Sequence, residues 1–168
     1  MTKTMTKTLT MVGTTLLWGL CIVALSACNE NDCSLTNVAL AHFDFLSGSG
    51  KSVTTTSEIT VTGTIVDEAG EARTDTLYNK ATSSLDLPIS YADNTTYVLH
   101  HTEAIRDTIW LTHDNIPHIA DIDCGAMMFH RITSVRHTTN ALDSIKLVNP
   151  EVTNEEKKNL DIYFTVAE

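Results

Sequence analysis

Basic residues are scarce in this sequence of 168 residues. Only 11 Lys and Arg side chains stand against 21 Asp and Glu side chains, which gives a formal net charge of −10. Because proteins hold phosphates with clustered Lys and Arg, this balance argues against a nucleic-acid binder. Charged residues make up 19 % and hydrophobic residues 42 %, a composition that argues against wholesale disorder. The length corresponds to roughly one domain of about 150 residues.

The motifs of common enzyme classes are also missing. The sequence contains no Gly-x-Ser-x-Gly nucleophile elbow and no glycine-rich loop of the kind that cradles phosphates. No two histidines have the i, i+4 spacing of the zinc proteases. We therefore expect a protein without enzymatic activity, cofactor or bound metal.

Helical patterns with caps are absent after residue 28, whereas strand patterns recur along the chain. Between residues 57 and 66, isoleucine and valine alternate with threonine, which is the period-two pattern of a half-buried strand. Pro88 places its own strand at a sheet edge or a bulge. Further strands are expected at residues 38–45, 85–89, 95–101, 105–111, 117–123, 126–135, 142–148 and 159–166.

Turns separate these expected strands at short intervals. We expect turns at residues 67–71, 93–94 and 114–115, and a charged loop rather than a helical turn at residues 151–158. About eight or nine short strands with frequent turns indicate an all-β fold. The predicted fold class is a two-sheet, immunoglobulin-like sandwich, with a small β-barrel as the alternative.

The first 27 residues have the order of a secretory signal. Residues 1–8 are basic and free of acids, residues 9–25 are mostly apolar, and the small residues Ser26 and Ala27 follow. The alternative is a membrane-spanning helix, which needs about 20 apolar residues. Threonine and glycine interrupt this stretch and no basic residue follows it directly, so we prefer the cleaved signal.

Leu25-Ser26-Ala27-Cys28 resembles the bacterial lipobox, in which the Cys thiol takes a diacylglyceryl group and the chain is cleaved before that Cys. Two or more acyl chains, such as palmitate, anchor a protein stably, whereas one chain binds membranes reversibly. A plain cleaved signal is the alternative. Cleavage would remove Lys3 and Lys7 but no acid, so the net charge would change from −10 for the full chain to −12 for residues 28–168.

Two further cysteines, Cys33 and Cys124, remain if Cys28 carries lipid. In an oxidising compartment a disulfide is the default interpretation of such a pair. It would enclose 90 residues between its ends, and the chain-entropy model assigns such a loop roughly 4–5 kcal/mol. The alternatives are two free thiols or a shared metal ion, although the sequence places no histidine ligands nearby.

Histidines and a pair of aspartates are the candidates for metal binding or acid/base catalysis. The segment His100-His101-Thr102-Glu103, with His113 and His118, invites a metal site, but successive strand residues point to opposite faces. We therefore expect surface or half-buried histidines. Asp121 and Asp123 would lie on one strand face, about 7 Å apart, which suits calcium or acid/base chemistry. A solvated strand edge is the interpretation we prefer.

Three triplets of the sequence have the order Asp-(Ser/Thr)-apolar: Asp75-Thr76-Leu77, Asp107-Thr108-Ile109 and Asp143-Ser144-Ile145. They resemble the sequon that Bacteroidota use for O-glycosylation of exported proteins, with Thr76, Thr108 and Ser144 as the hydroxyl residues. The alternative is chance, because strands that alternate polar and apolar residues generate such triplets. Trp110, Tyr97 and Tyr91 are candidates for a glycan-binding patch, although aromatic residues in strands belong more often to the core.

Six short segments, spread over nearly the whole of residues 28–168, together resemble a known protein family. They are Asn31-Asp32-Cys33-Ser34, Leu87-Pro88-Ile89, Cys124-Gly125, Ser134-Val135-Arg136-His137-Thr138, Leu142-Asp143-Ser144-Ile145 and residues 159–164. Together they resemble a family of small lipoproteins of unknown function from Bacteroidota. The resemblance implies a β-sandwich in which Cys33 and Cys124 are paired. It implies no activity, because none is established for the family.

The expected organisation is a signal peptide at residues 1–27, an anchor segment at residues 28–35 and one β-sandwich domain at residues 36–168. We expect a lipid-anchored protein of the bacterial cell envelope, in the outer membrane on its periplasmic or surface side. Its expected role is that of a non-enzymatic binding or accessory module.

The expected partners are the membrane, through the Cys28 lipid, and an envelope protein or a glycan. One alternative function is a small envelope hydrolase that uses Asp121, Asp123 or His118. The other is a glycan-binding protein.

Overall fold

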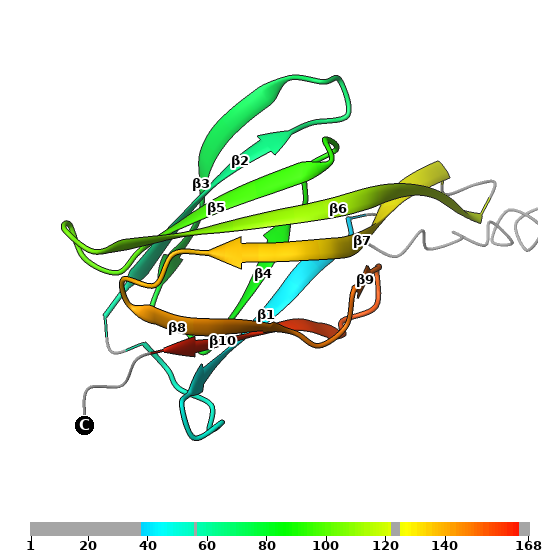
Figure 1. Cartoon of the computed structure of the whole chain (residues 1–168). Coiled ribbons are helices and arrows are strands. Elements are labelled where there is room, and N and C mark those ends of the chain that lie inside the picture. The colour runs from blue at the N-terminus through cyan, green and yellow to red at the C-terminus, as the bar shows by residue number, and fades with distance from the viewer. Residues whose placement is uncertain (1–37, 56, 122–124, 165–168) are drawn as a thin grey trace, which may run out of the picture. The chain divides into compact units, whose positions relative to one another are not determined.

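Two β-sheets make up the computed structural model of this protein, which describes residues 38–164 except residues 56 and 122–124 (Figure 1). This part of the chain contains ten strands and no helix, so it holds no helix that is long and apolar enough to cross a membrane. The strands are β1 Leu40–Ser47, β2 Ile59–Val66, β3 Ala72–Lys80, β4 Ser84–Pro88, β5 Asn94–His100, β6 Arg106–Asp121, β7 Gly125–His137, β8 Leu142–Leu147, β9 Glu151–Val152 and β10 Lys158–Phe164.

The strands divide into a four-stranded sheet with the order β4-β1-β10-β8 and a six-stranded sheet with the order β3-β2-β5-β6-β7-β9. The first and last strands, β1 and β10, pair in parallel at the centre of the smaller sheet. The sheets remain separate rather than closing into a barrel. The predicted all-β sandwich is therefore confirmed, with ten strands in place of about eight or nine.

One hydrophobic core joins the two sheets because the apolar face of each is turned toward the other. In β2 the buried Ile59 and Val61 alternate with threonines on the outer face, as the sequence predicts. The largest fully buried side chains come from both sheets and are Tyr97, Phe43, Phe45, Ile59, Leu85, Leu87, Leu99, Ile109, Leu111, Leu142, Leu160 and Ile162.

Tyr97 ties the sheets together at the centre of this core. It is fully buried in β5, and its hydroxyl donates a 2.7 Å hydrogen bond to the backbone oxygen of Pro88 in β4. Its ring meets Phe43 of β1 edge to face, with centroids 5.8 Å apart. Burial raises the pKa of the Tyr97 phenol, which keeps it a neutral donor. Tyr97 is thus a core residue and does not belong to a surface glycan patch.

The prediction of a turn at residues 114–115 is wrong, because β6 runs without interruption through these residues. The Asn115 side chain does not close a turn of its own. Instead its amide donates to the backbone oxygens of Tyr91 (2.6 Å) and Ala92 (3.3 Å). Antiparallel pairing with β7 continues on the other side, with Asn115 opposite His130. β6 and β7 therefore form a long hairpin that extends past β5 (Figure 1).

Two strands were not expected. β3 is an edge strand whose residues are mostly exposed, so it lacks the alternation of a half-buried strand. Its Leu77 packs over Gly63, where a Cβ atom would collide with the Leu77 side chain. The two-residue β9 lies within the segment expected to be a charged loop. Pro88 ends the edge strand β4, in agreement with its predicted place.

Candidate ligand pocket at the end of the sandwich

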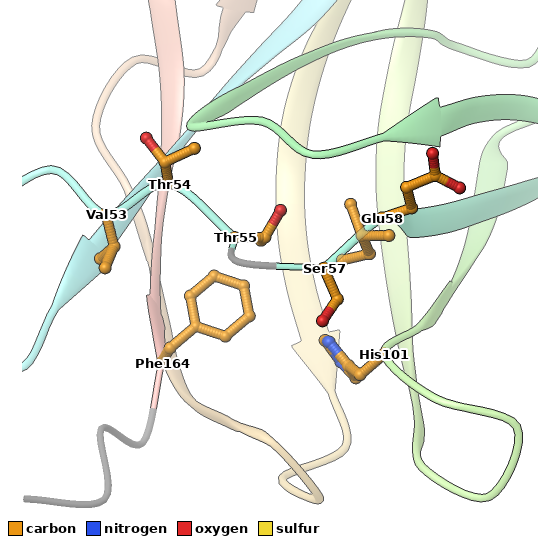
Figure 2. Close-up of a pocket in the computed structure, with 8 residues that line it drawn as sticks. Val53, Thr54, Thr55, Ser57, Glu58, His101 and Phe164 are labelled. Atoms are coloured by element: carbon orange, nitrogen blue, oxygen red, sulfur yellow. The ribbon is translucent and has the colours of Figure 1, made fainter.

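A pocket of about 300 Å³ lies where β5 and β10 end and β2 begins (Figure 2). Small-molecule sites commonly begin at this size. Its walls come from the linker before β2, from the β5–β6 turn and from the last residue of β10. The lining residues are Val53, Thr54, Thr55, Ser57, Glu58, Ile59, His101 and Phe164.

The linker wall is held by backbone pairing with two other segments. Val53 donates its backbone N–H to Phe45 at 2.9 Å, and Thr55 donates its backbone N–H to Thr82 at 2.9 Å. Thr82 returns a 3.1 Å hydrogen bond from its N–H to the Thr55 hydroxyl. The Phe164 ring meets Phe45 edge to face at 5.0 Å, so the apolar wall is a continuation of the core.

His101 is the central polar group of the pocket. It follows β5 directly, and its backbone N–H donates to Ile105 at 3.0 Å to close the β5–β6 turn. Its ring stands perpendicular to Phe164, with centroids 5.9 Å apart. Its Nε2 lies 3.1 Å from Oδ2 of Asp107 in β6. Figure 2 shows the nitrogen-bearing edge of this ring turned toward the hydroxyl of Ser57.

Asp107 is fully buried, and both oxygens of its carboxylate accept hydrogen bonds. Oδ1 accepts hydrogen bonds from the Thr138 hydroxyl (2.7 Å) and the Asn140 N–H (2.8 Å). Oδ2 accepts from the N–H groups of Ala141 (2.8 Å) and Leu142 (3.1 Å). Burial alone would raise the pKa of Asp107, but these hydrogen bonds outweigh it and hold the pKa below its usual value. The carboxylate is therefore ionised and only accepts hydrogen bonds.

The ionised Asp107 determines which nitrogen of His101 carries the proton. Burial lowers the pKa of His101 even though Asp107 raises it, so the ring is neutral at neutral pH. A neutral imidazole has one N–H and one bare nitrogen. Because Asp107 only accepts, Nε2 is the N–H that donates to it, and Nδ1 is the bare acceptor. The pocket thus offers an apolar wall beside a neutral imidazole acceptor, and the hydroxyl residues Thr54, Thr55 and Ser57 also line it.

Sequence reasoning did not find this pair, although a signal for it was present. Asp107 takes the same strand face as the apolar Ile109 and Leu111. A carboxylate among apolar neighbours on one face indicates a buried charge, and buried charges need specific partners. Those partners lie beyond β7 in the chain, so the strand pattern alone does not identify them.

The predicted metal candidates are dispersed. His100 points to the outer face of its sheet, where Nε2 lies 3.2 Å from the Thr62 hydroxyl, while the neighbouring His101 lines the pocket. His118 is exposed and stacks on Phe129, with ring centroids 4.3 Å apart. Within the residues that the structure describes, no three His, Cys, Asp or Glu side chains converge on one point.

His113 belongs to a second polar cluster, at the start of β5. Oδ1 of Asn115 lies 3.1 Å from Nδ1 of His113 and 2.7 Å from Nδ1 of the buried His130. Nε2 of His113 lies 2.9 Å from the hydroxyl of the buried Thr95. Burial, and secondly the neighbouring His113, lowers the pKa of His130 to about 4. The cluster is a satisfied structural network that fastens the β6–β7 hairpin to the sandwich.

Several other residues singled out in the sequence are not placed. Cys28, Cys33, Cys124 and Asp123 lie outside the described residues, and nothing is described of the Asp121 side chain. The lipidation site, the disulfide and the paired acids therefore stay predictions.

The three hydroxyls of the glycosylation triplets differ in accessibility. Thr76 is exposed on the edge strand β3. Ser144 is half-buried on the edge strand β8. Thr108 is half-buried in β6, between β5 and β7, and its neighbour Asp107 is fully buried.

Fold and site together define an all-β sandwich with a small, mainly apolar pocket at one end. The chain belongs to a family of unknown function (DUF6452), whose model matches residues 58–164. The match runs from just before β2 to the end of β10, and it includes His101, Asp107 and Phe164. No curated protein and no solved structure matches the chain.

Proposed function

We propose that this protein is a lipid-anchored module of the bacterial cell envelope that binds a small ligand without chemically changing it. The observation that carries the proposal is the pocket beside His101, with its apolar wall and its single oriented imidazole. Ligand sites typically combine apolar surface with a few fixed polar groups. The pocket has this composition at the lower end of the usual size range.

The anchor and the location are supported by sequence signals. Leu25-Ser26-Ala27-Cys28 behind an apolar stretch supports lipidation of Cys28, and the family resemblance supports a Bacteroidota lipoprotein of the outer membrane. The acidic domain would also be repelled by anionic membrane lipids, except at its anchor. Labelled fatty acid fed to cells should appear on the wild-type protein and be absent from Cys28→Ser. An unlabelled wild-type protein would show that there is no lipid anchor.

Binding in the pocket is tested with benzyl alcohol and the full chain in detergent. The amide signals of residues 53–55, 57–59, 101 and 164 should shift and saturate on titration. Ser57→Trp should abolish these shifts because the indole fills the pocket, whereas Ser49→Trp in the exposed β1–β2 loop should leave them unchanged. A titration without shifts at these residues in the wild-type protein would refute pocket binding.

A second candidate is a small hydrolase, and one observation favours it. The Ser57 hydroxyl is turned toward His101, which in turn contacts the buried Asp107 (Figure 2). Such an order of hydroxyl, imidazole and carboxylate is the arrangement of an activated serine nucleophile. A fluorophosphonate probe should label Ser57 if this candidate is correct. If the probe does not label Ser57 and 4-nitrophenyl acetate is not turned over, the hydrolase candidate is excluded and the binding module is retained.

A further inference from the structure

Asp107, which does not line the pocket, determines whether His101 offers the ligand a hydrogen-bond donor or an acceptor. Asp107 accepts four hydrogen bonds from residues 138–142 in addition to the contact with His101. These donors fix the carboxylate in its ionised form, so it has no proton to donate. The loop that follows β7 therefore determines, through Asp107, that His101 presents an acceptor rather than a donor to the pocket.

The charges of the lining residues favour an uncharged ligand over an anionic one. Glu58 is the charged side chain among the lining residues, and neither Lys nor Arg is among them. Arg106 lies in an adjoining depression, together with the two carboxylates of Glu58 and Glu103. An anionic ligand would thus lie near ionised Asp107 and Glu58, with no lining cation to balance its charge.

The apolar wall of the pocket favours a ligand with an aromatic ring. Ile59 is buried, and Phe164 presents its ring between the linker wall and His101 (Figure 2). Aromatic rings pack favourably against other rings edge to face or offset, as Phe164 already does with Phe45 and His101. A pocket of about 300 Å³ accommodates one ring with a short substituent.

We infer that the pocket is selective for a small, uncharged aromatic molecule that donates one hydrogen bond, such as an aromatic alcohol, and that it discriminates against aryl carboxylates. The donated proton goes to Nδ1 of His101, and the ring lies against Phe164. This inference rests on the proposed binding function and names the ligand class of the same site. An analogue that lacks the donor leaves Nδ1 of His101 unpaired, which weakens its binding relative to the alcohol.

The test compares benzyl alcohol, benzyl methyl ether and benzoate on the full chain, with affinities taken from the amide shifts of the pocket residues. The alcohol should bind about threefold or more tightly than the ether, the effect of one neutral hydrogen bond. Benzoate should bind most weakly. Because the ether carries an extra methyl group, hydrophobicity alone would predict the reverse order of alcohol and ether.

His101→Phe provides the variant and His100→Phe the matched control, since the neighbouring His100 faces the outer surface of the sheet. His101→Phe should make alcohol and ether bind alike, and His100→Phe should preserve the preference. In the wild-type protein, the imidazole ¹⁵N signals should show Nε2 protonated and Nδ1 bare.

Equal binding of alcohol and ether, a protonated Nδ1 or tight binding of benzoate would overturn the selectivity while leaving pocket binding intact. If none of the three probes shifts the pocket residues, the proposed binding function itself fails.

Discussion

Asp107 shows how a single residue can organise structure at some distance along the chain. Its carboxylate is fully buried, and it holds both the residues that follow β7 and the ring of His101. A buried charge of this kind is favourable only when its hydrogen bonds are complete. The same residue therefore supports the fold and sets the polarity of the pocket.

Asp107→Asn should destabilise the protein by about 2–4 kcal/mol, because the amide that replaces one oxygen turns a donor toward backbone N–H groups. The midpoint and slope of urea unfolding measure this loss. Asp114→Asn, at an exposed position of the same strand, is the control and should change stability little. Equal stabilities of the two variants would contradict the role given to Asp107.

At the scale of elements, the β6–β7 hairpin depends on a buried polar cluster for its attachment. Thr95 in β5, His113 and Asn115 in β6, and His130 in β7 form one connected network. The Asn115 amide extends this network to the backbone that precedes β5. The hairpin is thus attached through two imidazoles that burial favours in their neutral forms.

Stability should therefore fall as the pH is lowered from about 6.5 to about 4. In this window the unfolded chain binds a proton at His130 that the folded protein excludes, so acid favours unfolding. A pKa lowered from 6.5 to about 4 corresponds to about 3 kcal/mol once the pH is below both values. The pKa of His113 is lowered as well, which adds a change of the same sign.

Urea unfolding at several pH values measures this dependence. His130→Phe should make it shallower, because the ring can no longer take up a proton, whereas His118→Phe on the exposed part of the hairpin should leave it unchanged. An unchanged slope in His130→Phe would show that His130 does not cause the acid sensitivity.

Edge strands and central strands also differ as sites of modification. Thr76 lies exposed on the edge strand β3, whereas Thr108 is enclosed between two neighbouring strands. If the triplets direct O-glycosylation, intact-mass measurement of protein from its native envelope should show glycan mass that Thr76→Val removes and Thr108→Val keeps. A wild-type mass equal to polypeptide plus lipid would reject glycosylation.

At the scale of the whole molecule, the sequence predicts a long-range cross-link between Cys33 and Cys124. It would enclose 90 residues, and its reduction should destabilise the protein by roughly 4–5 kcal/mol in the chain-entropy model. Urea unfolding with and without dithiothreitol measures the change, and a Cys33→Ser/Cys124→Ser protein should not respond to the reductant. Two reactive thiols in unfolded, unreduced wild-type protein would disprove the cross-link.

Most of the fold was predictable where one face of a strand is buried. Residues 57–66 and 95–101 alternate so regularly that β2 and β5 were placed within about two residues. β3 was not found because an exposed edge strand has no apolar face to produce a pattern. The prediction of a turn at residues 114–115 was wrong because asparagine is a residue type that favours turns. In the structure the Asn115 side chain instead donates to the backbone before β5.

The sequence by itself determined the all-β class, since the period-two burial of side chains is a local property of each strand. It also contains the lipobox-like segment, a linear signal that is independent of the fold. Only the tertiary structure decided that His101, Asp107 and Phe164 meet at one pocket. Alternation reports which face of a strand is buried, but the partners of a buried carboxylate are set by the packing of segments far apart in the chain.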